Sequence, residues 1–132
     1  MNHDAQNIKI MQSYVDSLGK GDMETVGTLL ADDVIWHQPG GGHLSGLHSG
    51  KQNLFAHLGK FMELSSNTFR VTQTGSVMAN DDMVAATLHF KAERLDRVLS
   101  MDGVDVMRIV GGKIQEVWLF SSDQAAEDAF WR

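Results

Sequence analysis

The sequence predicts an α+β fold, a cone in which N-terminal helices pack on a curved, mostly antiparallel sheet. Two observations predict it. Apolar residues at helical spacing dominate the first half of the chain, and four strand-like runs separated by turn residues occupy the second half. The length of 132 residues is enough to bury one core but not two, so we expect one domain over residues 1–132.

Three helices are expected ahead of the main strands. The first covers about residues 4–18, where an apolar stripe recurs every three or four positions: Ile8, Met11, Val15 and Leu18. Asp22 is a favourable N-cap for a second helix over residues 23–30, which we expect to end at the acidic pair Asp32-Asp33. A third helix is expected over about residues 51–64.

The sheet is expected to start with a short strand over residues 34–38, because Pro39 cannot donate a ladder hydrogen bond. The glycine-rich segment 39–50 has no periodicity and is expected to be a surface loop that forms a lip over a pocket. Longer strands are expected over 68–78, 83–94, 98–110 and 113–121. The tail is expected to form one or two helical turns that dock Phe130 and Trp131.

Charge and composition exclude several classes of function. A net charge of −6 leaves no basic patch for nucleic acid or for an acidic membrane surface. The chain has no cysteine, which excludes disulfides, thiolate catalysis and sulfur-ligated metals. The N-terminus is too polar for a signal peptide, and no apolar run approaches the ~20 residues of a membrane span. We therefore expect a cytoplasmic protein.

Asp105 is the residue that does not fit its strand. It lies between Val104 and Val106, and strand alternation places it on the same face as Met107. Both faces carry apolar residues, so we expect both to be covered. A buried carboxylate is costly, and desolvation would raise its pKa. The alternatives are exposure near a sheet edge or pairing with an arginine, namely Arg94, Arg97 or Arg108.

Three further side chains are relevant to a pocket. Tyr14 borders the apolar stripe of the first helix, where core packing is the ordinary role of a tyrosine. Trp36 and Gln38 share one strand face, so if one lines a cavity the other does too. Gln38 would then orient a substrate or a water, or would instead satisfy backbone groups at the strand end.

Six histidines raise the question of a metal site. His37, His43 and His48 lie close in sequence, but their spacing matches no zinc signature, and no metal is expected. His37 points away from Trp36 by alternation. His48 and His89 are candidates for acid/base roles near neutral pH, although a structural role is the alternative for His89.

Three strings carry a family resemblance over nearly the whole chain: "SYVDSLGKGDMETVGTLLADDVIWHQPG", "GVDVMRIVGGKIQEVW" and "SSDQAAEDAFW". They resemble the nuclear-transport-factor-2-like superfamily, and within it the SnoaL-like and ketosteroid-isomerase-like branch. The resemblance implies the cone-shaped fold and a homodimer, for which the outer sheet face and Trp118 are candidate contacts. It implies no single reaction, because this superfamily hosts many.

The resemblance also suggests roles for residues. Tyr14 falls where steroid isomerases have the tyrosine of their oxyanion hole, and Asp105 falls where they have a neutral aspartic acid that donates to the enolate. Gln38 replaces the aspartate that is their general base, so the standard steroid isomerase route is not expected. Limonene-epoxide-hydrolase-like proteins are similar at Trp36 and Gln38, but their Asp-Arg-Asp set is not reproduced.

These observations favour a cofactor-independent isomerase, cyclase or dehydratase that acts on a hydrophobic carbonyl compound such as a polyketide, steroid or terpenoid. Asp105 would act either as a neutral acid beside Tyr14 or as the base, with Gln38 orienting the substrate. The expected substrate-binding residues are Trp36, Met101, Met107, Leu88 and Phe90. The alternatives are a non-catalytic binding or dimerisation module and, less favoured, an epoxide hydrolase.

Overall fold

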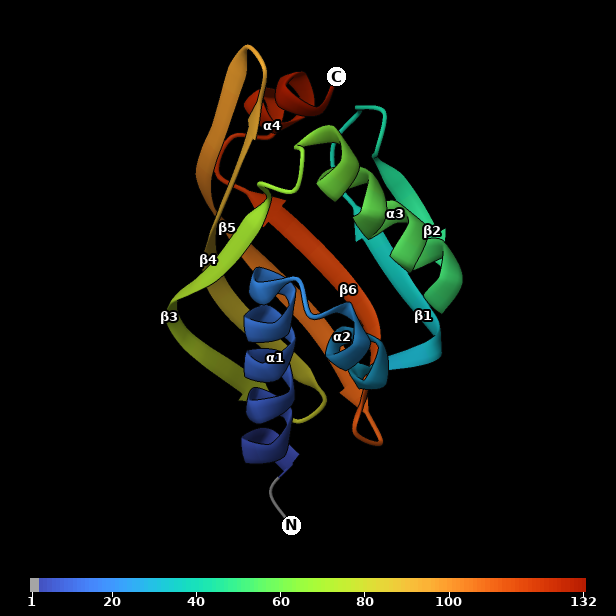
Figure 1. Ribbon diagram of the computed structural model, residues 1–132. Coiled ribbons are helices and arrows are strands. Elements are labelled where there is room, and N and C mark those ends of the chain that lie inside the picture. Colours follow the sequence, from blue (N-terminus) through green and yellow to red (C-terminus); the bar gives the residue numbers. More distant parts are fainter. Residues whose placement is uncertain (1–2) are drawn as a thin grey trace.

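The computed structural model describes residues 3–132, in which four helices pack on a curved, open sheet of six strands (Figure 1). The helices are α1 His3–Lys20, α2 Met23–Leu29, α3 Lys51–Leu64 and α4 Gln124–Trp131. The strands are β1 Leu30–Gln38, β2 Gly46–Ser49, β3 Arg70–Asn80, β4 Met83–Arg94, β5 Arg97–Val110 and β6 Lys113–Ser121. The predicted α+β cone is confirmed.

The sheet has the strand order β2-β1-β6-β5-β4-β3. Only the β1–β6 pair is parallel among the strand pairs of residues 3–132, and the other neighbours run antiparallel. The β5–β6 hairpin closes through Gly111 and Gly112, whose φ angles of 59° and 80° explain why glycine is needed at both turn positions. The long β3–β6 meander forms the wall of the cone.

The helices cover the inner face of the sheet. α1 packs on β3 and β4 through a buried stripe that includes Met11, Tyr14 and Val15, as its periodicity predicted. α2 begins at the N-cap Asp22, whose side chain accepts a hydrogen bond from the Thr25 backbone N–H at 3.1 Å. α3 packs on β1, and α4 lies at the end of the molecule opposite the N-terminus (Figure 1).

Two predicted boundaries near β1 are wrong. The strand begins at Leu30 rather than residue 34, so Asp32 and Asp33 lie within it instead of ending α2. A register irregularity between Leu30 and Ile35 accommodates this, since both aspartates remain exposed. The expected loop 39–50 contains β2, an edge strand paired with β1. Backbone pairing at an edge needs no apolar pattern, so periodicity in the sequence does not indicate β2.

The two faces of β5 are covered unequally, and this corrects the expectation that both faces are covered. Asp105, Met107 and Ile109 are buried on the inner face. On the outer face Val104, Val106 and Arg108 are half-buried, and Val110 is exposed. The sheet is therefore amphipathic, with its helices on one side only. Within residues 3–132, no helix combines the length and apolar character needed to cross a lipid bilayer.

Candidate active site

A narrow cavity of about 60 Å³ lies between the inner face of the sheet and α1, α3 and α4. Its lining is mostly apolar: Leu18, Trp36, Leu58, Phe61, Phe69, Val71, Leu88, Phe90, Leu119 and Phe120. Its polar lining residues are Gln38, Asp105, Ser121 and Glu127. Phe120 is 58% exposed, so the lining extends to the surface there. A space of this size holds one end of a small molecule and not a whole drug-sized ligand.

Asp105 is positioned by the register of β5. It lies opposite Ala86 of β4 and Leu119 of β6, and Leu119 lines the cavity with it. Only 8% of Asp105 is exposed. Burial, and then the negative charge of Glu127, raise the pKa of Asp105 from its ordinary 3.8 to about 7. Its proton is therefore available for exchange near neutral pH.

No arginine neutralises Asp105, so the alternative of an arginine pair is excluded. Arg94 donates to the backbone oxygens of Phe130 and Arg132, Arg97 donates to neighbouring carbonyls of α4, and Arg108 pairs with Glu116. Within residues 3–132, no hydrogen bond reaches the Asp105 carboxyl. The carboxyl is thus buried without the partners that usually stabilise its charged form.

Gln38 is held by two donors on one atom. Its Oε1 accepts from Trp36 Nε1 at 2.9 Å and from His57 Nε2 at 2.9 Å. Because a carbonyl oxygen only accepts, His57 carries its proton on Nε2. Among the described residues, the Gln38 amide nitrogen has no hydrogen-bond acceptor. The cluster therefore fixes the amide so that its N–H groups remain the part that can donate to a ligand.

His57 is neutral in this cluster. Its side chain is buried, and its ring stacks on that of His48 with centroids 3.8 Å apart. Burial, and then the charge of His48, lower the pKa of His57 from 6.5 to about 4. His48 itself bonds the carbonyl oxygen of Leu44 at 3.2 Å. His57 can thus donate steadily to Gln38 across the neutral range.

His37 and His89 lie away from the cavity. His37 bonds Glu116 at 2.6 Å and stacks on Trp118, on the outer face as alternation predicted. His89 bonds Asp102 and Ser100, which supports the structural interpretation of that residue. Within the described part of the chain, no group of three or more histidine, aspartate or glutamate side chains is arranged to hold a metal ion.

Tyr14 is fully buried and does not reach the cavity lining. Its hydroxyl has no hydrogen-bond partner among residues 3–132, and burial, then the charge of Asp105, raise its pKa well above 10. Of the expected substrate-binding residues, Leu88, Phe90 and Trp36 line the cavity. Met101 and Met107 do not line it, because Met107 is sealed within the core and Met101 packs against that core.

Two residues of the site were missed by sequence reasoning. Glu127 on α4 lines the cavity and is 7% exposed, and His57 on α3 holds Gln38. A signal existed for both. Glu127 lies three and four positions before the buried Phe130 and Trp131, and His57 falls between Leu54 and Phe61 on the apolar stripe of α3. A polar residue on an apolar helix face marks an exception worth explaining.

Comparison with known proteins places this geometry in a family. The family model described as a SnoaL-like domain matches residues 11–117. A crystal structure of a protein of unknown function with a cystatin-like fold, from Xanthomonas campestris, is 46% identical, with a TM-score of 0.90 over 95% of this chain and 97% of that one.

Two further relatives extend the match over nearly the full length. Bal32a, from a soil-derived mobile gene cassette, is 27% identical, with a TM-score of 0.94 over 99% of this chain and 100% of that one. An uncharacterised protein of Mycobacterium bovis is 27% identical over 97% of this chain and 98% of its own length. These relatives support the fold and name no reaction.

Proposed function

Because this chain belongs to the SnoaL-like family, we propose that it is a cofactor-independent acid/base enzyme that moves a proton on a hydrophobic, carbonyl-containing small molecule. A polyketide, steroid or terpenoid fits this description, and the reaction class is isomerisation, cyclisation or dehydration. One observation carries the proposal: Asp105 has no partner among the described residues and lies in a mostly apolar cavity, where burial and Glu127 raise its pKa to about 7.

The proposed step begins with Asp105 in its ionised form. Its carboxylate takes a proton from the carbon beside the substrate carbonyl, and the electron pair of that C–H bond moves onto the carbonyl oxygen as an enolate. The Gln38 N–H groups donate to this oxygen, and Trp36 and His57 hold the amide in place. Asp105 then returns the proton to another atom of the substrate.

The position of Tyr14 favours this route over the alternative in which Asp105 is a neutral donor beside Tyr14. The tyrosine hydroxyl lies outside the lining, whereas Gln38 belongs to it. Gln38 replaces the aspartate that the family resemblance leads one to expect before Pro39, and an amide cannot accept a proton at neutral pH. The proposal therefore assigns the role of base to Asp105.

The test uses 2-indanone, a small ketone with acidic C–H groups beside its carbonyl, dissolved in D₂O with the protein. We expect the wild type to accelerate deuterium incorporation at those carbons, as followed by proton NMR. Asp105→Asn should reduce the protein-dependent rate about 100-fold or more, because an amide cannot exchange the proton. The same rate in Asp105→Asn as in the wild type would refute the role of Asp105.

Asp102→Asn is the matched control. Asp102 lies on the same strand three residues away, but it is exposed and bonds His89 on the outer face. This variant also replaces a carboxylate by an amide, but at a residue that does not line the cavity. It should exchange deuterium at the wild-type rate.

A non-catalytic binding module is the second candidate. Two observations favour it. The cavity is small, and position 38 beside Pro39 carries an amide instead of a second catalytic carboxylate, which is compatible with binding without catalysis. In the same experiment this candidate predicts that 2-indanone quenches the fluorescence of Trp36 while deuterium exchange stays at the solvent rate. Epoxide hydrolysis has no support from Asp105, Gln38 and Trp36 alone.

Two expectations from the sequence, the oligomeric state and the cellular location, remain proposals. We propose a homodimer that forms through the outer face of the sheet, where Val104, Val106 and Trp118 are only half-buried and Phe120 is exposed. We also propose a cytoplasmic location, in accord with the absence of cysteine.

A further inference from the structure

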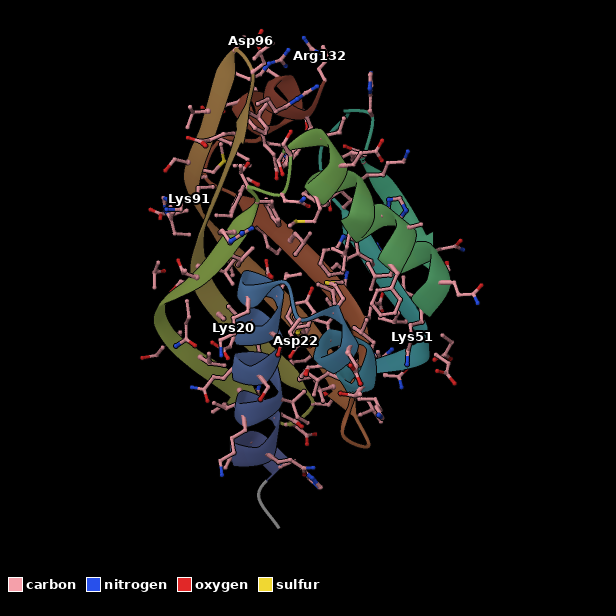
Figure 2. The ribbon with its side chains drawn as sticks, viewed as in Figure 1. Lys20, Asp22, Lys51, Lys91, Asp96 and Arg132 are labelled. Carbon is pink, nitrogen blue, oxygen red and sulfur yellow. The ribbon has the colours of Figure 1, made fainter. Side chains whose placement is uncertain are left out.

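Glu127 shares the cavity with Asp105 but reaches it from a different element. It projects from α4, on the helix face that buries Phe130 and Trp131. The N-terminus of α4 is capped by Asp123, and the arginines of the β4–β5 hairpin donate to the carbonyls at its C-terminus. Figure 2 shows Asp96, at the tip of that hairpin, close to Arg132. The sheet thus fixes the position of Glu127.

The two carboxyl groups differ in their hydrogen bonds. Glu127 Oε1 accepts from Ser121 Oγ at 2.6 Å and from Gln124 Nε2 at 3.0 Å. Asp105 accepts from no donor among the described residues. Hydrogen bonds from neutral donors stabilise the ionised form of a carboxyl group, so Glu127 should lose its proton at a lower pH than Asp105.

Other charged or titratable groups lie around the pair on several sides. Asp128, also on α4, contributes to the raised pKa of Glu127, after the larger effect of burial. The groups on other elements are Tyr14 of α1, His57 of α3 through Gln38, His43 of the glycine-rich loop, and Arg94 and Arg97 of the β4–β5 hairpin. Both arginines bond backbone oxygens, so neither neutralises a carboxyl of the pair.

We propose that Glu127 is a positioning residue for Asp105: Glu127 ionises first, and its negative charge then opposes the ionisation of Asp105, so that Asp105 exchanges its proton near neutral pH. This inference rests on the proposed function of Asp105. It explains how the two carboxyl groups of a solvent-accessible cavity share one exchangeable proton. Two carboxyl groups in one pocket release their protons in two steps, because the first charge opposes the second. Between those steps the pair holds a single proton.

The test is a titration of the ligand-free protein with ¹³C-labelled aspartate and glutamate carboxyls, followed by NMR. In Glu127→Gln the neutral amide can keep the Ser121 bond, and the pKa of Asp105 should fall by about one unit or more. In Asp105→Asn, Glu127 should titrate as in the wild type, because Asp105 is still neutral when Glu127 ionises. This asymmetry is the signature of ordered release.

Glu116→Gln is the control, since it removes one carboxylate from the outer face of β6, where Glu116 bonds His37 and Arg108. It should leave the pKa of Asp105 unchanged. An unchanged Asp105 titration in Glu127→Gln, or a wild type in which Asp105 ionises before Glu127, would overturn the proposal. The titration needs no substrate, so a failure of 2-indanone exchange would reject the proposed function and leave this result standing.

Discussion

Asp105 and Gln38 show how local surroundings turn ordinary side chains into reactive or directing ones. A carboxyl group in water ionises near 3.8, but Asp105 is enclosed by apolar walls and faces Glu127, so its pKa lies at about 7. Gln38 is directed by its neighbours, because Trp36 and His57 occupy its oxygen. The chemistry of the cavity therefore depends on residues that do not themselves react.

His57 leads to a prediction about stability and pH. Its pKa is about 4 in the folded protein and 6.5 ordinarily, so the unfolded chain binds a proton more readily between these values. The contribution of His57 to stability is complete above pH 6.5 and is lost as the pH falls to 4. We expect His57→Phe, which keeps an aromatic ring against Phe61, to lose less unfolding free energy than the wild type over that interval.

Urea denaturation at a series of pH values measures this difference. Replacement of the exposed His43 by asparagine controls for the removal of a histidine. If His57→Phe and the wild type lost stability in parallel from pH 6.5 to 4, the buried neutral histidine would not be responsible.

At the residue scale, the sequence pattern identified Asp105 because a carboxylate interrupts an apolar strand. It identified Trp36 and Gln38 because they share one strand face. Successive residues of a strand point to opposite faces of the sheet. One neighbour of known orientation is therefore enough to assign a side chain to the inner face. His57 and Glu127 were missed because a helix has a wider apolar stripe, at whose edge a polar residue passes as exposed. Their role depends on a tertiary contact that local spacing does not encode.

At the scale of elements, α4 acts as a cover for the cavity that is attached by its ends. Arg94 donates to Phe130 and Arg132 oxygens at 2.7 and 2.9 Å, and Arg97 donates to the Ala129 oxygen at 2.8 Å. A cation at a helix C-terminus both satisfies unpaired carbonyls and interacts favourably with the helix dipole. The hairpin tip thereby controls how firmly Glu127 is held.

The double substitution Arg94→Gln with Arg97→Gln should loosen α4 selectively. Each cation contributes roughly 0.3–1 kcal/mol at a helix terminus, so the opening of α4 should become easier by up to about 2 kcal/mol. Amide hydrogen exchange measures this directly, with α1 as the internal control because it packs on β3 and β4 elsewhere. Equal acceleration in both helices would indicate general destabilisation instead.

The elements that the sequence predicted incorrectly have physical reasons in common. The extension of β1 to Leu30 depends on a register irregularity that lets Asp32 and Asp33 face solvent, and β2 is an edge strand held by backbone pairing. Neither feature leaves an apolar period in the sequence. By contrast, β4, β5 and α1 each bury one face and were predicted closely.

At the scale of the whole molecule, the cone follows from a sheet whose helices cover one side only. The order of helices and strands predicted this architecture, but the size of the cavity depends on which side chains meet across the sheet, such as Leu119 beside Asp105. Such meetings are set by register, which a single sequence specifies only indirectly. This is why the presence of a pocket was predictable and its narrow shape was not.

The placement of Asp105 also has a cost for the whole molecule. Its folded pKa of about 7 lies above the ordinary 3.8, so the folded state binds a proton more tightly than the unfolded state. The contribution of Asp105 to stability is complete below pH 3.8 and is lost as the pH rises through 7. A residue kept for chemistry at the expense of stability is typical of a functional site.

The most direct test of this account is the titration of the Asp105 carboxyl carbon by NMR in the ligand-free wild type. We predict that the group loses its proton at a pH of about 7, in the apolar hollow beside Glu127. A midpoint at the ordinary value of 3.8 would contradict the account, since neither burial nor Glu127 would then act on the Asp105 carboxyl, and its carboxylate would be too weak a base at neutral pH.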